Sequence, residues 1–292
     1  MNKFGGHTMS GRLRRVLVKR PTQAFVSAAQ IAAQWQDLAY LEPPDLARAA
    51  DEHARFVALL ERAGAEVDYL PTDPRTGLDS IYTHDPALIT DAGAITFHTG
   101  KPARQGEGPA LAGALPALGI PLLGQVQAPG TAEGGDMIWL DSHTLAVGRT
   151  YRTNPEGIIQ LRALLEPLDV EVVQVPVVHW TGPGEVLHLM SFISMLAADL
   201  AVVYARLLPI PFRETLLERG IRLLEIPDAE FSTQGCNVLA LAPHLCLMLE
   251  GNPVTQKRLE AAGCEVWTYQ GDEISFKGSG GPTCLTRPLW RG

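Results

Sequence analysis

The sequence lacks the signatures of several large classes of protein. Its 4 cysteines form no CxxC pair and its 8 histidines form no HExxH motif, so no metal site is expected. The N-terminal segment carries charges but no apolar core, which argues against a secretory signal peptide. Scattered cysteines without such a signal predict a reduced, cytoplasmic protein.

Basic charge is also scarce. The chain has 24 Lys and Arg against 32 Asp and Glu, for a net charge of −8. Nucleic acids and anionic membranes both require a cationic surface, so neither is an expected partner. The main basic cluster, interpreted as a solvated lead-in, comprises Arg12, Arg14, Arg15, Lys19 and Arg20. The expected partner is a small molecule, and homo-oligomerisation is left open.

No apolar run is both long and free of charge. The longest, residues 186–212, is interrupted by His188, Asp199 and Arg206, which are costly inside a bilayer. We interpret it as two buried strands joined by a turn near Asp199. The chain shows no linker, low-complexity tract or shift in composition. We therefore expect a flexible lead-in at residues 1–15 and a single domain at residues 16–292.

What the sequence does contain is a set of five motifs, spaced by about 50 residues. They lie at residues 84–86, 133–136, 185–188, 235–237 and 280–284. Each opens an apolar segment that doubles back on itself. Four of them supply a carboxylate, a carboxylate pair, an imidazole and a thiol. If the units are arranged around an axis, these groups meet at one place and form a thiol-based active site.

Helical periodicity separates the doubled-back segments. It predicts helices within residues 43–65, 154–168, 213–220 and 252–264, each followed by a short strand-like run. The unit is therefore strand, strand, helix, strand. The fifth unit is split between residues 16–21 and residues 284–289, which would close a ring within one α/β domain.

Each candidate residue has an ordinary alternative. Cys284 follows a Gly-Gly-Pro turn that can present a nucleophile, but a buried structural cysteine fits equally well. A lone His188 is more simply a core histidine. The acids of EGGD and Asp85 could be turn residues. Their common phase with Cys284 favours catalysis, because turn residues scattered at random would not share it.

In these motifs the chain resembles the guanidine-modifying enzyme superfamily, which includes arginine deiminase, dimethylarginine dimethylaminohydrolase and the amidinotransferases. The matching pieces are HDPA with Asp85, PAR with Arg104, EGGD with Glu133, RTN with Arg152, HL with His188 and GGPTC with Cys284. They occur in family order over nearly the whole chain. The resemblance implies a five-bladed α/β propeller built from pseudo-five-fold repeats.

The resemblance also implies a role for each position. Cys284 would attack the guanidino carbon to give a covalent thiouronium intermediate, and His188 would protonate the leaving amine and then activate water. Glu133 would hold His188. The residues implied in substrate binding are Asp79, Asp85, Arg104, Asp136 and Arg152: Asp85 for the guanidinium, the two arginines for the α-carboxylate, and Asp79 for the α-amino group. The polar loop that bears Arg104 could also act as a lid.

Two positions depart from the family pattern. Arginine deiminases and amidinotransferases carry a second acid two residues after the histidine, where this chain has Met190, whereas dimethylarginine hydrolases also lack that acid. His84 stands where better-known dimethylarginine hydrolases have an acid. Both departures remove negative charge from the guanidinium site. Met190 could therefore face methyl groups, or could simply be core.

The expected function is hydrolysis of the guanidino C–N bond of an N-methylated arginine, releasing citrulline and an alkylamine. No cofactor is expected, because thiol, imidazole and carboxylate cover the nucleophilic, acid–base and electrostatic roles. Arginine deimination and citrulline hydrolysis are the alternatives within the same enzyme class. A non-catalytic relative that only binds an amino acid is the alternative from another class.

Overall fold

Five three-stranded sheets stand around a common axis in the computed structural model, which describes residues 3–184 and 186–292. The sheet orders are β3-β4-β5, β6-β7-β8, β11-β10-β9, β12-β13-β14 and β15-β1-β2. In four sheets an antiparallel hairpin is followed by a helix and a parallel third strand. The predicted five-bladed α/β propeller is confirmed. Residue 185, in the third motif, lies outside the described residues.

The strand bounds match the doubled-back segments. The strands are β1 Leu13–Val18, β2 Glu66–Tyr69, β3 Ala87–Thr90, β4 Gly93–Thr96, β5 Leu122–Gln125, β6 Met137–Asp141, β7 Thr144–Arg149, β8 Glu171–Pro176, β9 Ile193–Ala197, β10 Leu200–Val203, β11 Arg222–Glu225, β12 Val238–Ala242, β13 Leu245–Leu249, β14 Glu265–Tyr269 and β15 Arg287–Arg291. Strands β3, β4, β9, β10 and β12 are buried at every position. Such strands read as continuous apolar runs because both faces are covered.

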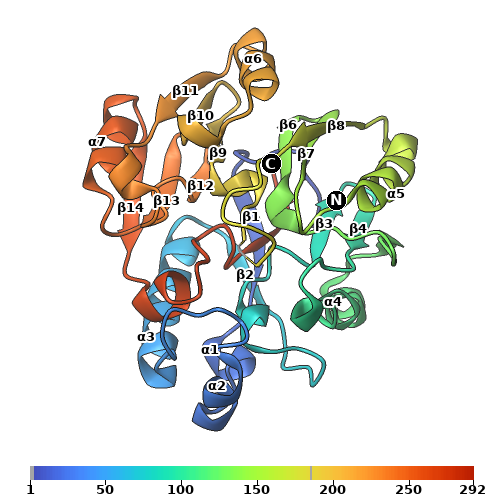
Figure 1. The fold of residues 1–292 in the computed structure, drawn as a ribbon, viewed down its shortest axis with the longest axis vertical. Coiled ribbons are helices and arrows are strands. Elements are labelled where there is room, and N and C mark those ends of the chain that lie inside the picture. Colours follow the sequence, from blue (N-terminus) through green and yellow to red (C-terminus); the bar gives the residue numbers. More distant parts are fainter. Residues whose placement is uncertain (1–2, 185) are drawn as a thin grey trace.

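The helices lie on the outside of the molecule, around the blades (Figure 1). They are α1 Pro21–Ala24, α2 Ala28–Gln34, α3 Leu46–Arg62, α4 Glu107–Ala114, α5 Pro155–Leu165, α6 Ile210–Glu218 and α7 Pro253–Ala261. Helices α3, α5, α6 and α7 fall where periodicity predicts them. The alanine- and glycine-rich α4 has almost no apolar stripe, so the pattern did not reveal it. No helix in the described part of the chain is long and apolar enough to cross a membrane.

The split blade closes the ring as predicted. Strand β15 from the C-terminus pairs antiparallel with β1, and β1 pairs parallel with β2. The segment 186–212 likewise forms the hairpin β9–β10, which turns at residues 198–199. Strands from the N-terminal and C-terminal parts of the chain therefore belong to one sheet. Hydrogen bonds between β1 and β15 close the ring of blades.

The N-terminal segment differs from the flexible lead-in that composition predicted. Gly5 donates from its backbone N–H to the carbonyl of Leu289 at 2.8 Å and accepts from the N–H of Arg291 at 2.9 Å. His7 stacks on Trp139 at a centroid distance of 4.2 Å. Arg15 is buried and pairs with a carboxylate on β2. Residues 3–15 are ordered because they add backbone hydrogen bonds beside β15, which composition does not reveal.

The five motifs meet at one end of the axis, where each precedes the first strand of its sheet. Hydrogen bonds join neighbouring starts in a closed ring. They run from Gly134 N to Asp85 O, from Leu189 N to Asp136 Oδ1, from Ser194 Oγ to Cys236 O, from Thr283 N to Asn237 Oδ1 and from His84 N to Cys284 O, all at 2.7–3.2 Å. The predicted convergence of an acid, an imidazole and a thiol is thus what the fold produces.

Candidate active site

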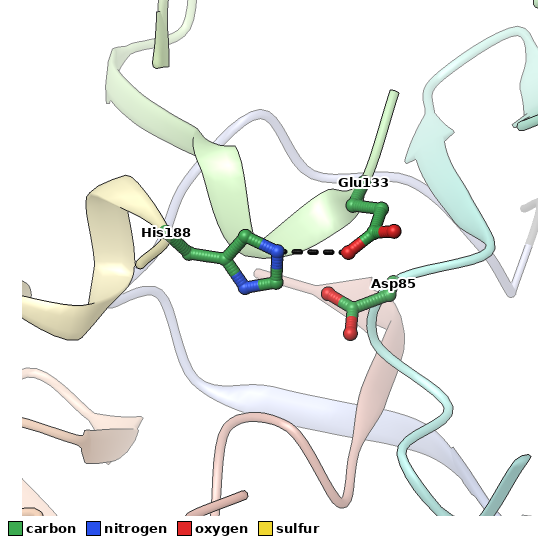
Figure 2. A group of neighbouring side chains, drawn as sticks. All are labelled: Asp85, Glu133 and His188. Carbon is green, nitrogen blue, oxygen red and sulfur yellow. Dashed lines mark hydrogen bonds and ion pairs between the residues drawn. The ribbon is translucent and has the colours of Figure 1, made fainter. Parts of the chain in front are cut away.

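His188 and Glu133 form the central pair of the site (Figure 2). The Nε2 atom of His188 lies 2.9 Å from Oε2 of Glu133, and both side chains are buried. The backbone N–H of His188 donates to the hydroxyl of Ser191 at 3.0 Å, which fixes the turn that leads into β9. A Cβ atom on Gly135 would collide with the imidazole ring. The second glycine of EGGD is therefore needed so that the histidine can approach.

Charge around His188 favours its imidazolium form. Burial by itself would lower the pKa of His188, but the carboxylates of Asp136, Asp85 and Glu133 outweigh burial and raise the pKa to about 9. The pKa of Glu133 is lowered from its usual value, because its bond to His188 offsets the burial that would raise it. At neutral pH the pair is an imidazolium held by a carboxylate, which suits a general acid.

Cys284 is half-buried and accepts a hydrogen bond from Asn237, whose Nδ2 lies 3.3 Å from the sulfur. Burial raises the pKa of the thiol to about 11, and the charge of Asp85 adds to that shift. The Asn237 bond acts in the opposite direction. Without a cation at the site the sulfur is therefore a thiol, and a guanidinium that docks beside it would favour the thiolate.

Asp85 lies opposite the imidazole and is also buried. Its Oδ1 accepts from the backbone N–H of Gly135 at 2.9 Å and its Oδ2 from Nη1 of Arg104 at 2.6 Å. Burial would raise the pKa of this carboxyl, but Arg104 and His188 hold it well below its usual range. Asp85 is thus a fixed negative charge, and each oxygen retains a lone pair that can accept from a planar cation.

Arg104 is placed differently from the prediction that it grips an α-carboxylate. Its Nε and Nη2 donate to both oxygens of Glu107 at 2.9 and 2.8 Å, Nη1 donates to Asp85, and Nη2 also reaches the carbonyl of Tyr82 at 3.0 Å. Arg104 lines a polar cavity at Cys284, but most of its N–H donors are already used in these buried bonds. The geometry therefore makes Arg104 the residue that orients Asp85.

Asp136 also differs from its predicted contact with substrate. One oxygen accepts from the hydroxyls of Thr150 and Thr153 at 2.7 and 2.6 Å, and the other accepts from the backbone N–H of Leu189 at 3.0 Å. Its side chain is buried, and it has no place among the residues that line the cavities at Cys284. Asp136 ties the turn that follows His188 to the neighbouring blade and supports the charge of the imidazole.

Arg152 and Asp79 line a cavity that is also lined by Cys284 and His188. Arg152 reaches Oε1 of Glu133 through a long contact of 3.4 Å, so its guanidinium retains donors for a ligand. Asp79 pairs with Nζ of Lys101 at 2.7 Å, and Lys101 also donates to the carbonyl of Leu38 at 2.9 Å. Arg152, Lys101 and Asp79 thus bring two cations and one anion to the cavity, a set that is complementary to an amino-acid headgroup.

The loop at residues 98–108 does not have the exposure expected of a lid. Arg104, Glu107 and Gly108 are buried, and a Cβ atom on Gly108 would collide with the carbonyl of Phe97. The buried ion pair with Asp85 anchors the loop to the site. The loop therefore forms a fixed wall of the site. Its polar sequence did not reveal that the charges of Arg104 and Glu107 are paired with each other.

Two cavities meet at the candidate catalytic pair. A polar cavity of about 120 Å³ is lined by Asp79, Arg152 and Lys101, and a second cavity of about 320 Å³ is lined by His84 and Met190. Both cavities are lined by Cys284 and His188. The sequence left open whether Met190 faces the substrate or is simply a core residue. Met190 lines a cavity at Cys284 and His188, which agrees with the first alternative.

His84 is buried in the second cavity, and its Nδ1 lies 2.9 Å from the carbonyl of Thr286. Burial, reinforced by the charge of Arg287, lowers the pKa of His84 well below its usual value. It is therefore a neutral imidazole at the position where the sequence departs from the family pattern. On this side the guanidinium site therefore has one acid fewer than the family pattern implies.

Asp85, Glu133 and His188 form the group that could hold a metal ion, since their ligand atoms all lie within 4.8 Å of one another. However, the hydrogen bond between His188 and Glu133 and the bonds to Asp85 already use these atoms. A metal would have to displace the imidazolium proton. The donor set fits an acid–base pair better than a metal centre.

Sequence reasoning missed two residues of the site. Asn237 follows Cys236, which is buried and whose Sγ points to the carbonyl of Val202. Asn237 was visible as the polar residue that opens the fourth unit. Lys101 lies three residues before Arg104, and its pairing with Asp79 depends on a loop contact that spacing does not reveal.

The geometry defines a class: a five-bladed α/β propeller with a thiol, an imidazole and paired carboxylates at one end of its axis is a member of the guanidine-modifying enzyme superfamily. A family model described as N,N dimethylarginine dimethylhydrolase, eukaryotic, matches residues 27–291. The chain therefore belongs to the dimethylarginine dimethylaminohydrolase family.

Individual proteins agree with this assignment. The N(G),N(G)-dimethylarginine dimethylaminohydrolase of Pseudomonas aeruginosa is 27% identical over 276 residues, covering 94% of this chain and 98% of its own. Arginine deiminase of Mycobacterium marinum is 32% identical over 190 residues, covering 54% and 46%. A structure of the Pseudomonas aeruginosa enzyme, a mutant complexed with citrulline, has a TM-score of 0.76 at 22% identity and covers 94% of this chain and 98% of its own.

Proposed function

We propose that the protein hydrolyses the guanidino C–N bond of N-methylated arginine, releasing citrulline and an alkylamine. The observation that carries the proposal is the placement of Cys284, His188 and Asp85 around one small cavity that is also lined by Arg152 and Asp79. Family membership supports the same reaction. A small arginine-type amino acid is the ligand that this distribution of charge fits.

In the proposed mechanism, the guanidinium docks against the carboxylates of Asp85 and Glu133, and its positive charge stabilises the thiolate of Cys284. The sulfur attacks the guanidino carbon. His188 then gives its proton to the departing nitrogen, the C–N bond breaks, and a thiouronium remains on the sulfur. His188 next takes a proton from water, which attacks the same carbon, and the C–S bond breaks to release citrulline.

Headgroup recognition follows from the charged residues that line the polar cavity. We assign the α-carboxylate to Arg152, assisted by Lys101, and the α-amino group to Asp79. A substrate without the carboxylate would leave the free N–H donors of Arg152 without an acceptor from the ligand, which costs binding energy. We also propose that the enzyme works as a cytoplasmic protein with reduced thiols, since the four cysteines are free in the structure.

Arginine deimination is the second candidate, favoured by the arginine deiminase relative. The lining of the second cavity favours the methylated substrate, because Met190 stands where a second acid would bind an unsubstituted nitrogen. The two candidates differ only in the leaving amine, so a competition between substrates separates them.

The test is incubation of the protein with equal amounts of arginine, monomethylarginine, dimethylarginine and citrulline, followed by mass spectrometry. We expect the methylated arginines to be converted to citrulline, and the Cys284→Ser variant to lose turnover by at least about 10³-fold. Preferential loss of arginine, or formation of ornithine, would assign the chain to deimination or citrulline hydrolysis instead. Full activity of the Cys284→Ser variant would rule out the thiol mechanism, and no turnover at all would favour a non-catalytic amino-acid-binding relative.

A further inference from the structure

The second cavity at Cys284 is larger than the reaction of a methylated arginine requires. It has a volume of about 320 Å³, whereas the polar cavity has about 120 Å³. We name it the apolar chamber and define it by Leu41, Trp180, Met190, Phe231 and Phe276 together with Cys284 and His188. Asp79 and Arg152 line the polar cavity and are not among the residues that line the apolar chamber.

The apolar chamber differs from the polar cavity in charge. Among the described residues that line it there is no Asp, Glu, Lys or Arg, whereas the polar cavity is lined by both acids and cations. His84 in its wall is neutral, since burial and Arg287 lower its pKa. A charged ligand would therefore find no counter-ion there beyond His188 itself. A neutral apolar group can enter without losing a counter-ion, although the lining also includes the neutral polar residues Gln234 and Asn237.

Contacts between aromatic rings hold the aromatic wall of the chamber in place. The rings of Trp180 and Phe231 meet edge to face with centroids 5.9 Å apart. Phe231 is in turn stacked on Tyr204 at 4.2 Å, behind the chamber. Edge-to-face and stacked contacts of this kind hold rings in fixed orientations. The wall is preorganised for an apolar occupant.

Several side chains of the chamber remain exposed without such an occupant. Leu41 is 59% exposed, Trp180 is 46% exposed and Phe276 is 41% exposed. These apolar groups come from three separate segments of the chain and gather beside the nucleophile. Large exposed apolar side chains that gather around a cavity are typical of a ligand-binding site.

Chemistry decides which part of a substrate would reach the chamber. The guanidino carbon must bond to Cys284, and the leaving nitrogen must accept the proton of His188, so any group on that nitrogen starts where the two cavities meet. A water molecule takes up about 30 Å³ in the liquid, and a methyl group is of similar size. Two methyl groups would therefore fill only a small part of the chamber.

We propose that the apolar chamber binds the substituent of the leaving amine, and that the substrates of this protein include arginines with an Nω-alkyl or Nω-arylalkyl group larger than methyl. This inference rests on the proposed function and names its substrate class. The reaction is balanced: substituted arginine and one water give citrulline and the substituted ammonium ion. The C–N bond breaks, the carbonyl oxygen comes from water, and no oxidant or reductant is required.

The first experiment compares kcat/KM for Nω,Nω-dimethylarginine, Nω-propylarginine and Nω-benzylarginine. We expect the propyl and benzyl compounds to be at least as good as dimethylarginine, because each covers apolar side chains that dimethylarginine leaves exposed. Turnover of dimethylarginine with a benzyl value more than a hundredfold lower would overturn the inference while the proposed function stood.

The second experiment tests the aromatic wall with Trp180→Ala. We expect the ratio of kcat/KM for benzylarginine to that for dimethylarginine to fall about tenfold, equivalent to about 1.4 kcal/mol. Ile210→Ala is the matched control, since Ile210 is an exposed apolar residue on α6, 72% exposed and not among the lining residues. An equal ratio in Trp180→Ala and in the control would contradict the inference.

A binding measurement keeps the inference testable apart from catalysis. Calorimetric titration of the Cys284→Ser variant with benzylarginine and with dimethylarginine reports affinity without turnover. We expect benzylarginine to bind at least tenfold more tightly, and Trp180→Ala in the same background to remove that preference. Weaker binding of benzylarginine than of dimethylarginine would overturn the inference, and failure of both to bind would overturn the proposed function as well.

Discussion

At the scale of single residues, the site is organised by close approach and by opposing charge. Gly135 is needed because the ring of His188 packs against its Cα, and Gly281 is needed because a Cβ atom there would collide with the side chain of Asn237. Three buried acids raise the pKa of His188 to about 9, while burial raises that of Cys284 to about 11. In the free enzyme at neutral pH, His188 is therefore an imidazolium and Cys284 is a thiol.

The first prediction concerns pH. The reactive form has a thiolate and an imidazolium, which together hold one proton fewer than the resting pair. We expect kcat/KM for dimethylarginine to rise about tenfold per pH unit from pH 6 to 8 and to level near pH 9, where the first of the two protons is lost. The substrate guanidinium stays charged over this range. Steady-state rates between pH 5 and 10 check this, and a flat profile between pH 5 and 9 would contradict the coupling.

The second prediction concerns Asn237, a positioning residue for the nucleophile. Its Nδ2 donates to the sulfur and lowers the pKa of the thiol, while its Oδ1 accepts from the N–H of Thr283. Loss of a hydrogen bond to a charged group costs about 1.5–3 kcal/mol. We expect Asn237→Ala to lower kcat/KM about 10–100-fold and to shift the pH dependence of alkylation of Cys284 by iodoacetamide upward.

Asn237→Asp separates the two roles of Asn237. It keeps the oxygen that accepts from Thr283 but replaces the donor with a charge that opposes the thiolate. We expect it to shift the alkylation profile upward at least as far as Asn237→Ala does, although it preserves the turn. If neither variant moved that profile, Asn237 would have only a structural role.

At the scale of secondary structure, each blade delivers its motif by the same arrangement. A turn carrying the polar residue leads into a buried first strand, and an outer helix returns the chain to the edge of the sheet. Asn154 shows how local sequence enforces this. Its Oδ1 accepts from Gly157 N at 2.8 Å, which caps α5, and also from Thr131 N at 2.9 Å in the segment before EGGD. The cap thus joins a helix to the turn that carries Glu133.

The third prediction tests this cap. We expect Asn154→Ala to lower the free energy of unfolding by about 1–2 kcal/mol, because two backbone N–H groups lose their acceptor. Asn154→Asp retains the acceptor oxygen and loses only the bond from Nδ2 to the carbonyl of Pro129 at 2.8 Å, so it should lose less stability than the alanine variant. Urea denaturation with an unchanged m value is the measurement. Equal stability of the alanine and aspartate variants would show that the cap does not contribute.

At the scale of the whole molecule, closure of the ring creates the site. The hydrogen bonds between neighbouring motifs join all five blades, and the last blade requires both ends of the chain, as β15 pairs with β1. Glu133 and His188, which are 55 positions apart, meet only because their blades are adjacent. Catalysis is therefore expected to depend on the integrity of the split blade, whose strands β1 and β2 are far from Cys284 in sequence.

The fourth prediction follows from the N-terminal segment. Deletion of residues 1–10 removes the backbone bonds of Gly5 to β15, the bond from Gly6 N to Asp91 at 2.7 Å and the stack of His7 on Trp139. We expect a loss of about 1–3 kcal/mol in stability, measured by urea denaturation. The variant His7→Ala measures the stack alone. A deletion without effect would restore the interpretation of this segment as a solvated lead-in.

The sequence by itself determined the repeating unit, the split fifth blade, the helices α3, α5, α6 and α7, and the phase that brings acid, imidazole and thiol together. These depend on periodicity and turn chemistry, which are local. Only the tertiary structure decided which charges pair. Arg104 binds Asp85 and Glu107, Asp136 binds Thr150 and Thr153, and Lys101 binds Asp79.

Partner choice among buried charges depends on distances between blades and on the desolvation of each group, neither of which is encoded in spacing along the chain. The same holds for the apolar chamber, whose walls come from separate segments near residues 41, 180, 231 and 276. Each segment taken alone shows only an isolated apolar residue, which is ordinary on a protein surface. Their assembly beside Cys284 exists only once the ring is closed.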